Sequence, residues 1–256
     1  MSTSPPLILV TNDDGYDARG IAALASAMEA LGEVWIVAPD RERSAVSHAI
    51  TLQSPLRIKE LGHRRFTTDG TPTDCVFLAM QHLLPRPPAL VCSGINHGPN
   101  LADDVTYSGT VAGAMEGAIM GAPSISVSVD ARNPKDFTPA AEFAVAVGRH
   151  VMQVGLPART LLNINVPDTD GGPVTAFRWA RAGHRDYTHS VIVQHDPRGR
   201  PIYWIGSNIA HHTVENSDCD AVEAGLAAIT PIYLDMTHHA LLEAWGRVDL
   251  PGFDRR

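Results

Sequence analysis

Short apolar runs alternate with segments of helical periodicity through the first half of this 256-residue chain, and no other feature restricts the fold as much. The runs Leu7–Thr11, Val34–Ala38 and Ala89–Cys92 each have the length and composition of one buried strand. Between the first two, Gly20–Leu31 has apolar residues at three- and four-residue spacing, which is typical of an amphipathic helix. Because the strands are almost continuously apolar, we predict a parallel sheet covered by helices on both faces.

The pattern continues less regularly in the second half. We expect helices over residues 73–84, 110–121 and 139–154, and strands over 124–129, 161–166 and 228–234. A hairpin is predicted between residues 190–194 and 201–205, since Asp196-Pro197-Arg198-Gly199 suits a type I turn. The best candidate for a domain boundary is the break near Asp130–Pro139. The tail carries Trp245 and Phe253, which we expect to dock on the body or on a partner subunit.

Composition excludes several classes of protein. The chain has 28 acidic and 20 basic residues, and this net charge of −8 argues against binding to a nucleic-acid polymer or an anionic membrane. Neither a secretory signal nor an apolar run of about 18 residues is visible, so we expect no membrane span. The three cysteines form no close pair, which favours a reducing compartment and a cytoplasmic location.

Polar loops follow three of the predicted strands, and the carboxyl ends of parallel strands are where such sheets bind ligands. Asp13 and Asp14 follow the first strand, and adjacent carboxylates there can hold a hard divalent cation. The alternative is a turn or helix cap, since Asp-Gly is common in turns. Ser44 and Asn96, in the loops after the next two strands, add neutral oxygens and favour the metal interpretation.

A second candidate lies within Ser93–Thr110. Ser108-Gly109-Thr110 precedes a predicted helix, where free N–H groups and hydroxyls can bind phosphate, although a plain helix cap is the alternative. Glycine recurs every four residues from Gly109 to Gly121, which predicts a smooth helix face packed tightly under the site.

The 12 histidines do not form a zinc motif of the HExxH or HxH type, so we disfavour zinc. His48 and His97 lie in the candidate site loops, where each either assists proton transfer or substrate binding or is a plain surface histidine. The sequence lacks the nucleophile elbow GxSxG and the nucleotide motifs GxxxxGK[ST] and GxGxxG.

Taken together, these motifs resemble the SurE family, the stationary-phase survival proteins with 5′/3′-nucleotidase activity. NDDG, SGINxGxN and YSGTV in this order make the resemblance specific, and it covers most of the chain. The matching segments are Ile8–Gly15, Ala38–Thr51, Gly70–Val76, Ser93–Asn100, Asp104–Gly117 and Ile229–Thr237.

The resemblance implies an α/β fold: a Rossmann-like three-layer α/β/α core over residues 1–135, with a mainly parallel sheet. Residues 136–256 would add the completing helix and strands, a β-hairpin extension and a C-terminal oligomerisation arm, all within one compact domain. A homodimer or homotetramer is expected.

The resemblance also implies a metal-dependent 5′-nucleotidase, or acid-phosphatase-type phosphoric monoester hydrolase. One Mg²⁺ or Mn²⁺ ion per subunit would be held by Asp13, Asp14, Ser44 and Asn96. The phosphate would lie against Asn100, Ser108, Gly109 and Thr110. The expected reaction is hydrolysis of nucleoside 5′-monophosphates, or of 3′-monophosphates or short polyphosphate, by a metal-activated water that Asp14 or Asp13 orients or deprotonates.

Two residues depart from the family pattern: Ala45 and Ala102 stand where the family usually has glycine, which changes loop shape if φ must be positive there. Two rival functions remain open. The first is a non-catalytic nucleotide- or phosphate-binding module, and the second is a metal-dependent hydrolase of another bond, such as an amide. The acidic pair favours catalysis over pure anion binding, since carboxylates repel a phosphate unless a cation intervenes.

Overall fold

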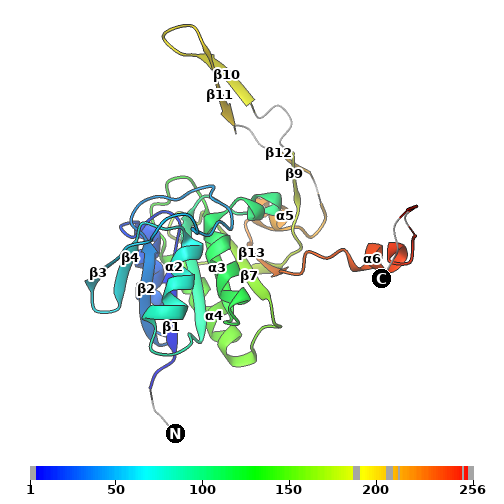
Figure 1. Ribbon diagram of the computed structural model, residues 1–256. Coiled ribbons are helices and arrows are strands. Elements are labelled where there is room, and N and C mark those ends of the chain that lie inside the picture. The colour runs from blue at the N-terminus through cyan, green and yellow to red at the C-terminus, as the bar shows by residue number, and fades with distance from the viewer. Residues whose placement is uncertain (1–3, 187–190, 206–209, 213, 250, 253–256) are drawn as a thin grey trace.

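The computed structural model describes residues 4–186, 191–205, 210–212, 214–249 and 251–252. A mainly parallel sheet runs through the body in the order β3-β4-β2-β1-β5-β6-β7-β13-β8 (Figure 1). Its five central strands are parallel, as predicted. They are β2 (Glu33–Pro39), β1 (Leu7–Thr11), β5 (Leu90–His97), β6 (Ser124–Asp130) and β7 (Thr160–Pro167).

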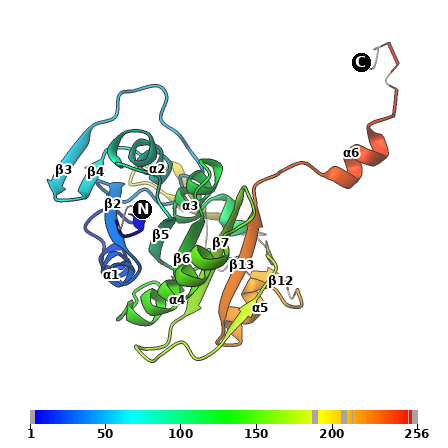
Figure 2. The same ribbon diagram turned by 90° about the horizontal axis from the view of Figure 1, so that it is seen from below.

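Helices cover both faces of this sheet, which confirms the three-layer α/β/α architecture. The helices α1 (Arg19–Met28) and α4 (Thr138–Val154) lie on one face, and α2 (Pro72–Leu78) and α3 (Gly109–Ile119) on the other (Figure 2). Side chains alternate along β1, so Ile8 and Val10 pack toward α1 while Leu9 packs toward α2. Burial on both faces explains why the strand is apolar at every position.

The predicted helix over 73–84 is shorter in the structure and changes its winding. Thr71 and Asp74 form a capping box at the start of α2, where Pro72 occupies the first turn. After Leu78 the chain continues as a π-helical turn, η1 (Ala79–Leu83), which ends before Pro85.

Several elements carry no pattern that predicts them. The antiparallel strands β3 (Ile58–Gly62) and β4 (Arg65–Thr68) extend one edge of the sheet, but they are short, and β3 is mostly exposed. Near the other edge, the strand predicted over 228–234 is present as β13 (Ala227–Tyr233), but it pairs antiparallel with β7, so the sheet is mixed there. The remaining short elements are η2 (Ala102–Thr106), β8 (Phe177–Trp179), β9 (His184–Asp186), β12 (Ala210–His212) and α5 (Asp218–Glu223).

The predicted hairpin is present and projects away from the body (Figure 1). Its strands β10 (Val191–His195) and β11 (Pro201–Ile205) pair antiparallel, and the Gly199 N–H donates to the Asp196 carbonyl, closing the predicted turn. Residue 190, the expected start, lies outside the described residues.

The tail leaves the body as an extended segment and ends in α6 (His239–Trp245) (Figure 2). Trp245 is 69% exposed, so within one chain it does not dock on the body. Phe253 lies outside the described residues. Within the described residues, no helix combines the length and apolarity needed to span a membrane.

Candidate active site

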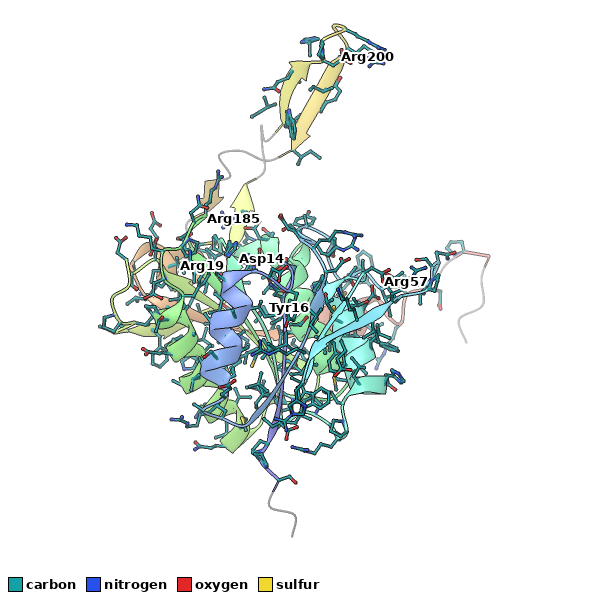
Figure 3. The ribbon with its side chains drawn as sticks, turned by 90° about the vertical axis from the view of Figure 1, so that its left-hand side faces the viewer. Asp14, Tyr16, Arg19, Arg57, Arg185 and Arg200 are labelled. Atoms are coloured by element: carbon teal, nitrogen blue, oxygen red, sulfur yellow. The ribbon has the colours of Figure 1, made fainter. Side chains whose placement is uncertain are left out.

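A cavity of about 660 Å³ opens at the carboxyl edge of the sheet, where the loops after β1, β2 and β5 meet the start of α3. Figure 3 labels Asp14 at this edge, below the projecting hairpin. Six of the predicted site residues line the cavity: Asp13, Asp14, Ser44, Asn96, Asn100 and Ser108. The other two, Gly109 and Thr110, are buried at the start of α3, directly against Asp13.

Asp13 is 4% exposed, and a residue at the start of α3 holds its side chain in place. The Thr110 hydroxyl donates to Asp13 Oδ1. Burial raises the pKa of Asp13 to about 6, the Thr110 hydrogen bond opposes this rise, and the neighbouring charge of Asp14 adds to it. Gly109 allows the close approach, because a Cβ there would lie 2.8 Å from Asp13 Cβ. The first carboxylate is therefore pressed against the helix at a cost that a nearby cation would offset.

The two oxygens of Asp14 differ in their surroundings. Its Oδ2 atom is buried and finds no hydrogen-bond donor among the described residues, while its Oδ1 atom lies 3.7 Å from His97 Nδ1. Burial raises the pKa of Asp14 to about 6, the His97 backbone N–H lowers it, and the charge of Glu42 raises it. A buried carboxylate oxygen with no donor is the kind of atom that a metal ion satisfies.

Two neutral oxygens face the same cavity. Asn96 directs its amide nitrogen to the Gly98 carbonyl at 2.8 Å, which leaves its oxygen for another partner. The Ser44 hydroxyl donates its proton to Glu42 at 2.8 Å, so its lone pairs are available to a cation.

The loop that carries Ser44 is irregular and strained. Ala45 and Ser47 have φ values of 55° and 54°, which favour glycine. Ser47 is tied down, because its N–H and its hydroxyl donate to the Tyr107 and Thr106 carbonyls. Ala102 also has a positive φ, 52°, so both positions where the family usually has glycine adopt the left-handed conformation.

The charge of the cavity favours a cation. Among its described lining residues, carboxylates come from Asp13, Asp14, Glu42 and Asp104, whereas Arg132 supplies a guanidinium. No group of three or more His, Cys, Asp and Glu side chains is arranged to hold a metal in the described part of the chain. A cation here would therefore rest on the Asp13–Asp14 pair and neutral oxygens, a donor set that suits Mg²⁺ or Mn²⁺.

The anion side of the cavity is the first turn of α3. Ser108 is the N-cap, since its hydroxyl accepts a hydrogen bond from the Val111 N–H. The first N–H groups of a helix have no carbonyl partner within the helix, so those of Gly109 and Thr110 are suited to an anion. The Thr110 hydroxyl itself is given to Asp13. Ser108 therefore caps the helix, and the same turn still offers N–H groups that suit an anion.

The glycines of α3 allow close packing below this turn, as predicted, except that Gly121 lies beyond the end of the helix, where a Cβ would meet nothing within 4 Å. A Cβ at Gly113 would lie 2.8 Å from Ser93 Oγ, and one at Gly117 would lie 2.5 Å from Ser124 Oγ. The helix therefore lies directly on β5 and β6.

The two site histidines differ in their surroundings. His97 lines the cavity and packs against Phe137, with ring centroids 5.3 Å apart. His48 is farther along its loop, where its Nε2 atom lies 2.9 Å from Oε2 of the buried Glu116 on α3. His48 thus ties the Ser44 loop to the helix that begins beside Asp13.

The cavity also contains residues that sequence reasoning missed, namely Glu42, Asp104, Tyr107 and Arg132. Glu42 lies two residues before Ser44, and Tyr107 directly precedes Ser108, so their positions in the motifs were the available signal. Arg132 follows β6, whose carboxyl end lies at the same edge of the sheet as that of β5, and this position after a predicted strand was its available signal.

These features define a Rossmann-like α/β/α protein with an acidic pocket at the carboxyl edge of its sheet. A family model described as "Survival protein SurE" matches residues 8–189, and the chain belongs to the SurE family.

Proteins similar to this chain match it over nearly its whole length. The "5'-nucleotidase SurE" of Myxococcus xanthus is 48% identical, over 100% of this chain and 98% of its own. The "5'-nucleotidase SurE" of Pelobacter propionicus is 51% identical, over 92% of this chain and 96% of its own. The crystal structure of the SurE protein from Aquifex aeolicus superimposes with a TM-score of 0.84 at 41% identity, covering 93% of this chain and 98% of that one. The resemblance seen in the motifs is confirmed.

Proposed function

We propose that this chain is a divalent-metal-dependent phosphomonoesterase that hydrolyses nucleoside 5′-monophosphates to nucleoside and phosphate. Its similar proteins are named 5′-nucleotidases. The observation that carries the proposal is the adjacent pair of the buried Asp13 and the half-buried Asp14 beside the first turn of α3. A cation held by this pair would lie next to an anion at the helix start, as a phosphate ester requires, and this supports the proposal. Nucleoside 3′-monophosphates and short polyphosphate are further candidate substrates.

One Mg²⁺ or Mn²⁺ ion would be held by Asp13, Asp14, Ser44 and Asn96. The Asp14 Oδ2 atom, which has no hydrogen-bond donor among the described residues, and the available Asn96 oxygen support this set. When bound, such an ion polarises a phosphoryl oxygen and makes water a better nucleophile.

The residues of the chain then have separate tasks. Asn100, Ser108 and the N–H groups of Gly109 and Thr110 would hold the phosphoryl oxygens and stabilise their charge. Asp13 is already committed to Thr110, so Asp14 is the better placed carboxylate to orient the attacking water or accept its proton.

The test is phosphate release from a panel of 5′- and 3′-nucleotides and polyphosphate, with Mn²⁺, with Mg²⁺ and with chelator. We expect chelator-sensitive release, fastest from a 5′-nucleotide. No release by folded protein with any metal would contradict the proposal and favour a binding module that lacks turnover.

We also propose a homodimer or homotetramer in the cytoplasm. The hairpin β10–β11 exposes Val193, Tyr203 and Trp204 by 55%, 65% and 58%. An isolated two-stranded hairpin is marginally stable in water, so this apolar surface needs a partner. The three cysteines are free and buried, which fits a reducing compartment. Light scattering that gives the mass of a monomer would contradict the oligomer.

A further inference from the structure

Asn100 is held by a buried network of side chains below the cavity. Its N–H donates to Asn165 Oδ1 at 2.7 Å, and its carbonyl accepts from the amides of Asn163 and Asn165 at 2.8 and 3.0 Å. Its own amide donates to Ser128 Oγ at 2.8 Å. Both backbone groups and the side chain of one residue are therefore fixed by three residues of β6 and β7.

These three residues are unusual for their positions. Asn163, Asn165 and Ser128 are fully buried on interior parallel strands, where apolar residues are the rule. Burying an amide is costly unless its hydrogen bonds are satisfied. The amides of Asn163 and Asn165 have hydrogen-bond partners, and Ser126 extends the network by donating to Asn163 Oδ1 at 2.9 Å. Four of the five hydrogen bonds given for this network are made with Asn100, so holding Asn100 accounts for most of it.

The loop that carries Asn100 needs such support. Between the end of β5 and the start of η2 it has no regular structure, yet Asn100 lines the cavity together with Ser108. A group that binds a phosphate effectively must be fixed before the ligand arrives. We propose that Asn163, Asn165 and Ser128 are positioning residues that set Asn100 for contact with the substrate phosphate. This inference rests on the proposed function.

A second anchor holds the same loop independently. The Ala102 N–H donates to Asp218 Oδ2 at 2.8 Å, and the N–H groups of Gly183 and Cys219 donate to Asp218 Oδ1. This buried carboxylate ties the loop to the start of α5. Removing one hydrogen bond of the Asn100 network should therefore disturb the side chain of Asn100 without releasing the loop.

The test compares Ser128→Ala with Ser124→Ala. Both serines are fully buried and lie on the same side of β6, but the Ser124 hydroxyl donates to the Ala122 carbonyl, outside the network. We would titrate orthophosphate into the Mn²⁺-loaded protein, titrate Mn²⁺ alone, and measure kcat and KM for a nucleoside 5′-monophosphate. For Ser128→Ala we expect about tenfold weaker orthophosphate binding and a higher KM, with Mn²⁺ affinity within about twofold of wild type. Ser124→Ala should match wild type.

If Ser128→Ala binds orthophosphate as tightly as Ser124→Ala does, the inference is overturned. Asn165→Ala is the second variant, with circular dichroism to establish that it folds. It should weaken orthophosphate binding at least as much as Ser128→Ala, and wild-type binding by this folded variant would also overturn the inference. Asn100→Ala distinguishes a failure of this inference from a failure of the proposed function. If the variant binds orthophosphate like wild type, and wild type hydrolyses nucleotides, the inference fails and the proposed function stands.

Discussion

The hydroxyl of Thr110 donates a hydrogen bond to Asp13, and this contact joins the start of α3 to the first carboxylate of the candidate metal site. The anion side and the cation side of the cavity are thus linked through one pair of side chains. A hydrogen bond to the ionised carboxyl favours its charged form, which is the form that binds a cation.

Thr110→Val keeps the shape of the side chain and removes this hydrogen bond. We expect about tenfold weaker Mn²⁺ binding with the fold retained, as is typical when a partner of a metal ligand is lost. Mn²⁺ titration of the metal-free protein measures the effect. Thr73→Val is the matched control, because Thr73 is equally buried at a helix start and its hydroxyl has no hydrogen-bond partner among the described residues. Equal Mn²⁺ affinity in both variants would show that Thr110 does not support Asp13.

Asp14→Asn should keep the fold and lose most of the metal-dependent turnover, because an amide neither attracts a cation nor accepts a proton as a carboxylate does. Phosphate release with Mn²⁺ and circular dichroism together test this. Asp17→Asn removes the same charge from an exposed position in the same loop and should behave like wild type. Wild-type turnover in Asp14→Asn would refute the role of Asp14.

The raised pKa values of Asp13 and Asp14 predict a pH-dependent response to metal. Burial raises the pKa values of Asp13 and Asp14 from 3.8 to about 6, so between these values the folded state binds more protons than the unfolded state. The stability they contribute in the protonated form is complete below about pH 4 and is lost as the pH rises through about 6. A cation replaces the protons only above that range.

We therefore expect Mn²⁺ to raise the Tm clearly at pH 7.5 and little at pH 4.5. Thermal unfolding with Mn²⁺ or chelator at both pH values measures the gain. In the Asp14→Asn variant the gain at pH 7.5 should be much smaller, which separates this site from the other acidic groups. A Tm gain that is equal at the two pH values would contradict the assignment.

The left-handed backbone of Ala45 and Ala102 predicts that glycine at either position stabilises the fold. Left-handed backbone costs alanine about 1 kcal/mol, and glycine adopts it without that cost, although glycine loses more entropy on folding. We expect Ala45→Gly and Ala102→Gly each to stabilise by a few tenths of a kcal/mol up to about 1 kcal/mol, raising the Tm by about 1–4 °C. Ala22→Gly, in the exposed face of α1, should destabilise by about 1 kcal/mol. Urea unfolding of the three variants gives the comparison, and destabilisation at Ala45 and Ala102 would show that their strain is not relieved.

The sequence predicts the central sheet well because its strands are buried on both faces, so the apolar runs are continuous. It predicts the site loops for a related reason, since Asp13, Ser44 and Asn96 each follow such a run. The edge strand β3 and its neighbour β4 are missed because about half of their residues face solvent, and because β4 is positioned by β2 and β3 by β4.

The supporting contacts of the site were not predictable from local pattern. Thr110 looks like part of a helix start, and its bond to Asp13 spans 97 residues. Asn163 and Asn165 look like interruptions of an apolar strand, since their partner Asn100 is more than 60 residues away. Such contacts depend on the register of neighbouring strands, which no local spacing encodes.

The support of Asn100 by β7 limits how this molecule can be shortened. Every proposed metal and phosphate contact lies before residue 111, so a fragment ending near residue 135 would carry the complete set of candidate ligands. It would still lack Asn163 and Asn165, and Asn100 would lose the partners of its own backbone. The candidate ligands and the β7 residues that hold Asn100 therefore lie in different halves of the chain. The first half, expressed alone, would contain every ligand but would not hold Asn100 in position.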